Sequence, residues 1–140
     1  MDKILSFKLA GEYFGIDINH VKEINRNVEY TAIPRAPETI VGLFNMRGQI
    51  VTLFNLAKFL GYGFQPETGK VTCIILKSSS NDPNQKGFLI DATGDVIDLD
   101  DAICEPPPAN VDGNGYKYVK KVARLENQLL MIIDPELLFT

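Results

Sequence analysis

The chain has 140 residues, of which 45% are hydrophobic and 23% charged, and its formal net charge is −4. This composition is typical of one globular domain with a buried core. The negative charge argues against a nucleic-acid partner, because phosphate binding depends on clustered Lys and Arg. The longest strictly apolar run, Leu129 to Ile133, is far shorter than the roughly 20 residues of a spanning helix, so we expect no membrane insertion. The N-terminal Met1-Asp2-Lys3-Ile4 lacks a signal core, which predicts a cytoplasmic chain.

The N-terminal segment predicts a β-hairpin, with one strand over Ile4 to Leu9 and the other over Tyr13 to Ile18. The next residues place Val21 and Ile24 on one side, either in a helical turn or in a bent strand, and periodicity alone does not separate the two. A further strand is predicted over Val28 to Ile33.

The stretch from Ile40 to Gly61 has the strongest local pattern in the chain. Two apolar runs, Ile40 to Phe44 and Gln49 to Phe54, flank a polar break that contains Gly48, which predicts a second hairpin. Asn55 then favours the start of a short helix as its N-cap. Because both runs are apolar on either face, we expect these strands to be central in their sheet rather than at its edge.

The second half of the chain repeats the pattern of short strands separated by turns. Predicted strands cover Val71 to Lys77, Phe88 to Ile90, Asp95 to Leu99, Tyr116 to Ala123 and Gln128 to Ile133. Many short strands with turn signals between them predict a mainly β fold of two small barrels, and not a βαβ fold.

An internal repeat relates the two halves of the chain. Gln49 to Asn55 aligns without gaps with Gln128 to Asp134, and both copies end in a helix-capping residue. A weaker similarity relates Phe14 to Asp17 with Phe88 to Asp91. Any two hairpin-plus-helix units look alike, but the gapless register favours duplication. We therefore expect residues 1–140 to form one domain built from two β-barrel subdomains with intertwined boundaries.

Three near-motifs for catalysis or metal binding each fail at a required position. Asp91 precedes Thr-Gly only after an inserted Ala, and its partner acid in an aspartic dyad would be Asp17, which has no following Gly. The segment Asn110 to Gly115 resembles a calcium loop, yet Lys121 occupies the position that requires a bidentate Glu. The acidic run Asp95 to Asp101 is typical of a solvated face. We therefore predict no catalytic activity, no cofactor and no metal site.

The two cysteines, Cys73 and Cys104, lie in apolar surroundings without a CxxC motif or a nearby histidine. This pattern favours buried free thiols over a disulfide or a metal site. The single histidine, His20, has no Ser, Cys or carboxylate at the spacing of a triad.

Taken together, several short segments in a fixed order resemble the CheW-like family, the coupling proteins of bacterial chemosensory arrays. These segments are Phe14 to Asp17, Val21-x-Glu23-Ile24, Ile33-Pro34, Gly42 to Val51, Phe54 to Gly61, Ile90-Asp91, Val96, Pro106 to Pro108 and Leu130 to Asp134. The resemblance implies a pair of five-stranded, SH3-like barrels around a shared core. It also implies a non-enzymatic adaptor that couples chemoreceptor (methyl-accepting protein) cytoplasmic tips to the regulatory domain of a CheA-type histidine kinase.

The resemblance further implies where the partners bind. Val21, Ile24 and the segment Asn45, Met46 and Arg47 would face a receptor-binding groove, and the kinase would pack against apolar barrel ends. Association with membrane-bound arrays would then be indirect, through these partners.

Three places depart from the pattern of the family. Met46 stands where Leu is usual, which is a swap of similar volume. Lys121 stands where Gly is frequent, at the place equivalent to Gly42, and Glu126-Asn127 replaces a turn that contains Gly. We therefore expect the edge of the second barrel, and with it one kinase-type contact, to differ from what the resemblance implies.

Two other interpretations are open at this point. One is a coupler of a non-motility chemosensory pathway that controls pili or a second messenger, with the same fold and other partners. The other is a small acid hydrolase, which would require Asp91 and Asp17 within hydrogen-bonding distance of each other.

Overall fold

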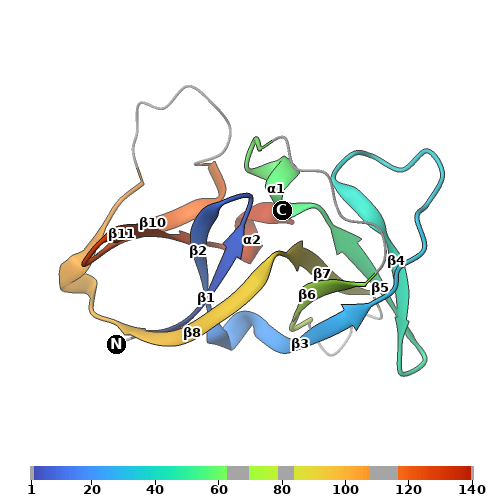
Figure 1. Ribbon diagram of the computed structural model, residues 1–140, viewed down its shortest axis with the longest axis horizontal. Helices are drawn as coiled ribbons and strands as arrows, with labels where there is room; N and C mark the ends of the chain where they lie inside the picture. The colour runs from blue at the N-terminus through green and yellow to red at the C-terminus, as the bar shows by residue number, and fades with distance from the viewer. Residues whose placement is uncertain (1, 63–69, 79–83, 108–116, 140) are drawn as a thin grey trace.

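The computed structural model describes residues 2–62, 70–78, 84–107 and 117–139, and it is mainly β (Figure 1). The first half of the chain comprises β1 (Asp2–Leu9), β2 (Glu12–Asp17), the 3-10 turn η1 (Ile18–His20), β3 (Val21–Val28), β4 (Ile40–Met46), β5 (Gln49–Phe54) and α1 (Leu56–Phe59). The second half comprises β6 (Val71–Leu76), β7 (Gln85–Ile90), β8 (Ala92–Leu99), the 3-10 turn η2 (Asp101–Ile103), β9 (Cys104–Glu105), β10 (Val119–Leu125), β11 (Gln128–Ile133) and α2 (Pro135–Leu138).

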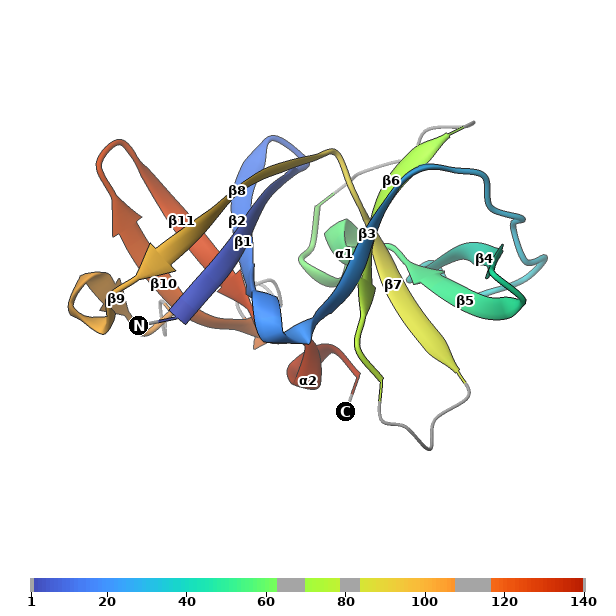
Figure 2. The same cartoon turned by 90° about the horizontal axis from the view of Figure 1, so that it is seen from below.

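The strands form two sheets that share one plan. The six-stranded sheet has the order β8-β1-β2-β11-β10-β9, and the five-stranded sheet has the order β3-β6-β7-β5-β4. In each, two hairpins meet through a parallel pair, β2 with β11 and β5 with β7. Each half of the chain begins with a hairpin, β1–β2 or β6–β7. The strand that follows this hairpin, β3 or β8, crosses to the other sheet (Figure 2). Each half of the chain therefore contributes strands to both sheets.

Each sheet closes through a short pairing beside one outer hairpin strand, β4 in the five-stranded sheet and β10 in the six-stranded sheet. In the five-stranded sheet, the N–H of Thr31 donates to the carbonyl of Leu43 at 2.8 Å, and the N–H of Leu43 donates back at 2.9 Å. In the six-stranded sheet, β9 occupies the same place beside β10. These contacts give two lobes, here called barrel A (the six-stranded sheet) and barrel B (the five-stranded sheet).

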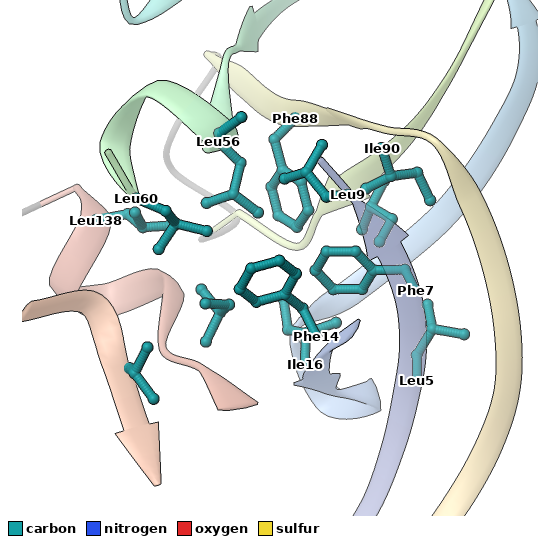
Figure 3. Close-up of a cluster of buried hydrophobic side chains, with 14 of the residues drawn as sticks. Leu5, Phe7, Leu9, Phe14, Ile16, Leu56, Leu60, Phe88, Ile90 and Leu138 are labelled. Carbon is teal, nitrogen blue, oxygen red and sulfur yellow. The ribbon is translucent and has the colours of Figure 1, made fainter. Parts of the chain in front are cut away.

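Three hydrophobic clusters follow from the alternation of side chains along the strands. One cluster fills barrel B and includes Leu53, and a second fills barrel A and includes Ile132. The largest lies between the barrels and draws Phe7 and Phe14 from one sheet and Phe88 from the other (Figure 3). Ring centroids in this shared cluster are 5.7–5.9 Å apart. Fully burying one such ring stabilises the fold by roughly 1.5–3 kcal/mol, so the shared cluster holds the barrels together.

The two predicted helix caps are confirmed. Asn55 Oδ1 accepts a hydrogen bond from the N–H of Lys58 at 3.2 Å, and Asp134 Oδ1 accepts one from the N–H of Glu136 at 3.0 Å. Each cap satisfies a backbone N–H that has no partner within its helix and contributes about 1 kcal/mol. Pro135 stands in the first turn of α2, where the N–H that proline lacks would have no partner within the helix.

One strand prediction is wrong, and another is correct only in part. Val28 to Ile33 is not a strand, because Val28 ends β3, and only Thr31 of the residues that follow makes a β-bridge. The second hairpin is central only in part. β5 lies between β7 and β4, but β4 stands at the end of the sheet order. Its apolar residues are covered by barrel closure and not by two flanking strands.

The weaker repeat is shifted by two residues from its predicted register. In the parallel pairs, Gly15 lies opposite Ile132 and Gly87 lies opposite Leu53. A Cβ on Gly15 would lie 3.1 Å from Ile132 Cδ1, and one on Gly87 would lie 3.4 Å from Leu53 Cδ2. The structural counterparts are therefore the two glycines, and not Phe14 and Phe88. Both segments have the sequence Phe-x-Ile-Asp, and aligning them on these residues gave the wrong register.

Several expectations concern residues outside the described ranges. They include the calcium-like segment Asn110 to Gly115 and Tyr116, the first residue of a predicted strand. Within the described ranges, Cys73 is buried and Cys104 is half-buried, and both are free thiols. No helix in the described part of the chain is long and apolar enough to cross a membrane.

Candidate functional site

A β-bulge in β3 decides how Val21 and Ile24 are presented. Val21 pairs with Leu76 and Ile24 with Ile74, and the register shifts between them. In a regular strand, residues three apart point to opposite faces, but the extra residue of a bulge turns both to the same face. Val21 and Ile24 are half-buried and pack their inner sides on the shared cluster. Of the two predicted alternatives, the bent strand is therefore the observed one.

β8 carries the matching bulge in the other half of the chain. Thr93 pairs with Phe7 and Val96 with Leu5, so two residues of β8 stand opposite the single residue between Leu5 and Phe7. Thr93 and Val96 consequently share one face, as Val21 and Ile24 do. The Val96 side chain is 50% exposed.

A hydrogen bond joins these two strands. Arg26 Nη2 on β3 donates to Thr93 Oγ1 on β8 at 3.0 Å, and Figure 2 shows that both strands lead from one lobe to the other. We call the surface formed by Val21 and Ile24 of β3 with Thr93 and Val96 of β8 the crossing-strand face. Sequence reasoning did not assign Val96 to a site, although Val96 is among the residues that carry the resemblance to the family.

The β4–β5 turn has an unusual backbone. Met46 pairs with Gln49, so Arg47 and Gly48 form a two-residue loop, with φ values of 52° and 85°. Such loops need positive φ at both positions, which glycine adopts readily and arginine does not. Asn45 Oδ1 accepts a hydrogen bond from the N–H of Gly48 at 2.8 Å and holds the loop closed. Asn45 therefore shapes the turn.

Arg47 reaches from this turn to β3. Its Nη2 donates to Glu23 Oε2 at 2.5 Å and its Nη1 to Glu23 Oε1 at 3.3 Å. The side-chain amide of Asn25 is oriented so that its nitrogen faces acceptors and its oxygen faces donors. In this orientation the amide nitrogen of Asn25 also donates to Glu23 Oε1 at 2.8 Å. Hydrogen bonding from Arg47 lowers the pKa of Glu23 against the opposing effect of burial, and hydrogen bonding to Glu23 raises the pKa of Arg47.

The ion pair lies behind the crossing-strand face. Glu23 pairs with Ile75, whose side chain fills barrel B, whereas Ile24 pairs with a residue of the shared cluster. Met46 is also on the inner side, with only 5% of its surface exposed in the barrel B cluster. The structure thus brings Arg47 to β3 and turns Met46 inward, so a direct partner contact by Met46 would require the side chain to leave the core.

The ends of the two barrels expose equivalent apolar side chains. Ile50 and Leu129 occupy the same position of the repeat, one strand residue after each hairpin turn, and are 52% and 51% exposed. A depression of about 810 Å³ adjoins Leu129, and its wall includes Val122, Met131 and Tyr62. Both barrel ends therefore present apolar surface of the kind that protein partners cover.

Barrel A accommodates Lys121, at the position where glycine is frequent in the family, through two ion pairs. The half-buried ammonium of Lys121 lies 3.0 Å from Asp2 Oδ2 and 3.3 Å from Asp101 Oδ1. The hydrogen bond to Asp2 is the main reason that the pKa of Lys121 is raised. At the equivalent place in barrel B, Gly42 lies against the backbone of Thr31, where no side chain fits.

The acid-hydrolase interpretation is wrong, because Asp17 and Asp91 stand far apart. Asp17 lies opposite Ile4 on β1, whereas the N–H of Asp91 donates to the carbonyl of Lys8. Four residues of extended chain separate those positions, which is roughly 13 Å. Asp91 instead accepts a hydrogen bond from the N–H of Ala10 at 3.0 Å. Among the described residues, no three His, Cys, Asp or Glu side chains gather as metal ligands.

Comparison with known proteins agrees with this architecture. The CheW-like domain family matches residues 3–140. Chemotaxis protein CheW of Treponema pallidum is 30% identical over 99% of this chain and 82% of its own length, and that of Bacillus subtilis is 26% identical over 95% and 83%. The crystal structure of the scaffolding protein TtCheW from Thermoanaerobacter tengcongensis superposes with a TM-score of 0.81 and 32% identity, covering 95% of this chain and 88% of the other.

A pilus-associated relative matches less of the chain. Protein PilI of Pseudomonas aeruginosa is 27% identical, but over only 44% of this chain, whereas the chemotaxis proteins match nearly all of it. The non-motility interpretation is therefore not favoured. The two barrels, their crossing strands and the match over residues 3–140 show that the chain belongs to the CheW-like domain family and is a coupling adaptor of bacterial chemotaxis.

Proposed function

We propose that this protein couples the cytoplasmic tips of chemoreceptors to a CheA-type histidine kinase, and that the crossing-strand face binds the receptor. The observation that carries the proposal is the pair of matched bulges, which turn Val21 and Ile24 to one face of β3 and Thr93 and Val96 to one face of β8, in two strands that the Arg26–Thr93 hydrogen bond joins. The protein would act in the cytoplasm at receptor arrays, held there by its partners.

The chemistry of the crossing-strand face suits a protein partner. Its centre is aliphatic, and its rim carries the Arg26 guanidinium, which stays exposed while it donates to Thr93. An apolar centre with a polar rim is the usual anatomy of a protein interface. Because Val21 and Ile24 also pack on the shared cluster, a partner on this surface would touch the element that holds the two barrels together.

Arg47 supports this surface from behind. Its two hydrogen bonds to Glu23 join the β4–β5 hairpin to the strand that carries Val21 and Ile24. The same hairpin carries Ile50, so one ion pair links the proposed receptor face with one barrel end. We propose that Arg47 acts first through Glu23, and that its exposed guanidinium edge lies at the rim of the receptor contact.

For the kinase we propose the two barrel ends, centred on Ile50 and Leu129. Both side chains are half exposed, although aliphatic residues are mostly buried in monomeric proteins. The resemblance implies that the regulatory domain of the kinase has the same fold, so its own barrel ends would offer a surface of similar shape. Burying such residues in an interface contributes most where they sit at its centre.

The receptor assignment is tested by truncating side chains on the crossing-strand face. Val96→Ala and Ile24→Ala each remove aliphatic carbon worth roughly 0.8 kcal/mol per methylene, so each should weaken binding of a receptor tip fragment about tenfold. Ile103→Ala is the matched control, because this exposed aliphatic residue lies on η2, away from β3. Isothermal titration of the three variants should show the loss for the first two alone. Equal affinity for all of them would refute the assignment.

The kinase assignment is tested separately. Ile50→Glu and Leu129→Glu each place a charge at the centre of a proposed contact, and each should weaken binding of the isolated regulatory domain while leaving receptor binding unchanged. Circular dichroism and a thermal melt verify the fold. Undiminished kinase binding by both variants, and by the double variant, would show that the kinase contacts another surface.

A further inference from the structure

The bulge of β8 is held by two hydroxyls, that of the buried Ser6 and that of the half-buried Tyr13. Tyr13 Oη on β2 donates to Ser6 Oγ on β1 at 3.0 Å, and Ser6 Oγ donates to the carbonyl oxygen of Asp95 on β8 at 2.7 Å. Ser6 is fully buried, at 0% exposure, between the two strands. The chain of donors spans three strands and ends on a backbone carbonyl of the bulge itself.

Gly94 completes this arrangement. A Cβ at Gly94 would collide with Ser6 Oγ and would lie 3.1 Å from Tyr13 Oη. The glycine does not have a positive φ, so its role is to let the two hydroxyls approach the backbone and not to supply an unusual conformation. The hydroxyls and the glycine therefore fit together at one point, the place where two residues of β8 face one residue of β1.

We propose that Ser6 and Tyr13 are positioning residues for receptor binding, because they fix the β8 bulge that presents Val96. This inference rests on the proposed function, in which the crossing-strand face binds the receptor. Without the bulge the register of β8 would slip, and a slip of one residue moves every side chain to the other face of a strand. Val96 would then point into barrel A and would be lost from the surface.

The matching bulge in β3 has an apolar side chain at the position that Ser6 occupies beside the β8 bulge. Ile75 pairs with Gly87 as Ser6 pairs with the equivalent Gly15, so Ile75 occupies in barrel B the place of Ser6 in barrel A. Ile75 lies opposite Glu23 of the β3 bulge, whereas Ser6 lies at the β8 bulge and donates to the carbonyl oxygen of Asp95. Ile75 is fully buried in the barrel B cluster, so the β3 bulge is supported by apolar packing. A hydroxyl in place of such a side chain gives up packing, and the hydrogen bond that the Ser6 hydroxyl donates goes to the bulge carbonyl.

The test removes the hydroxyls and measures receptor binding and local order together. Ser6→Ala and Tyr13→Phe should each weaken binding of the receptor tip fragment about fivefold, the factor that corresponds to one ordinary hydrogen bond. Amide hydrogen exchange should accelerate in β8 and stay unchanged in β3. Tyr118→Phe is the matched control, because Tyr118 lies beside the start of β10, and three strands separate β10 from β8 in the sheet order. It should leave both measurements unchanged.

A double-mutant cycle separates positioning from general stability. If Ser6 acts through Val96, then Ser6→Ala should weaken receptor binding much less in a Val96→Ala background than in the wild type. Kinase binding should be the same for Ser6→Ala and wild type. Tyr13→Phe is left out of the kinase comparison, because Tyr13 also lines the depression beside Leu129.

The outcomes distinguish the two proposals. Additive losses in the cycle, or full receptor affinity after Ser6→Ala while Val96→Ala loses affinity, would overturn the positioning role and leave the crossing-strand face intact. Unchanged receptor binding for Val96→Ala and Ile24→Ala would overturn the crossing-strand face and, with it, this inference. Accelerated exchange in β3 as well as β8 would show a global loss of stability and would also overturn it.

Discussion

Replacing Gly42 with alanine should destabilise barrel B more than a glycine-to-alanine change in a turn of this protein. A Cβ at Gly42 would collide with the carbonyl oxygen of Thr31 and would lie 2.9 Å from the carbonyl carbon. These are backbone atoms, so no rotation of a side chain relieves the contact. The segment must move away, which breaks the two hydrogen bonds between Thr31 and Leu43 that close the barrel.

The magnitude follows from these two effects. Overpacking costs about 1–3 kcal/mol, and two ordinary hydrogen bonds contribute about 1 kcal/mol each. Because the strain is relieved as the bonds break, the two effects do not add fully, and we expect a loss of about 2–4 kcal/mol. For a chain of this size, each kcal/mol lowers the melting temperature by roughly 3 °C. Gly42→Ala should therefore melt about 6–12 °C below the wild type.

Urea denaturation and a thermal melt measure this loss, with Gly11→Ala as the matched control. Gly11 has a φ of 80°, but a Cβ at this position would meet no atom within 4 Å, so its replacement should cost only about 1 kcal/mol of conformational strain. Similar stabilities for the two variants would refute the reasoning, since it assigns the larger loss to the contact with Thr31. A stable Gly42→Ala protein would show that the connection after β3 yields without weakening the barrel.

Three further outcomes are expected. Arg47→Glu places two carboxylates together and should weaken receptor binding more than kinase binding, and the swap with Glu23→Arg should restore part of the loss in the same titrations. The pKa of Glu23 is lowered in the fold, so the ion pair stabilises above the ordinary value of 4.5 and this contribution disappears as the pH falls below it. Melts of wild type and Arg47→Met should accordingly converge between about pH 6 and pH 3, and a constant difference would contradict this. Burial raises the pKa of Cys73 to about 12, so a thiol reagent at neutral pH should modify Cys104 in the native protein and Cys73 only after denaturation, as mass spectrometry of digested protein would show.

Local patterns in the sequence determined the hairpins, the helix caps and the family. Gln49 to Phe54 and Gln128 to Ile133 form the strands that their apolar patterns predict, and Asn55 and Asp134 cap the following helices. These features depend on residues close together in the chain, and propensity, patterning and capping chemistry are local properties. For the same reason, the motif residues that mark the family are visible without coordinates.

The candidate site depended on contacts between residues far apart in the chain. Ser6 and Asp95 are 89 residues apart, and Arg26 and Thr93 are 67 apart. A bulge adds one residue to a strand and so interrupts the alternation of side chains between the two faces, but no fixed sequence motif marks its position. The shared face of Thr93 and Val96 was therefore not predictable from alternation. The same lack of a local signal explains the two-residue error in the weaker repeat.

The sequence by itself thus determined which segments are strands and which family they compose. Only the tertiary structure decided that β3 and β8 cross between the barrels, that Met46 turns inward, and that the Arg47 guanidinium is paired with Glu23. The physical reason is that a side chain's exposure and charge partners depend on strand register and on neighbours from the other half of the chain. The pattern of residues within one segment determines neither the strand register nor these neighbours.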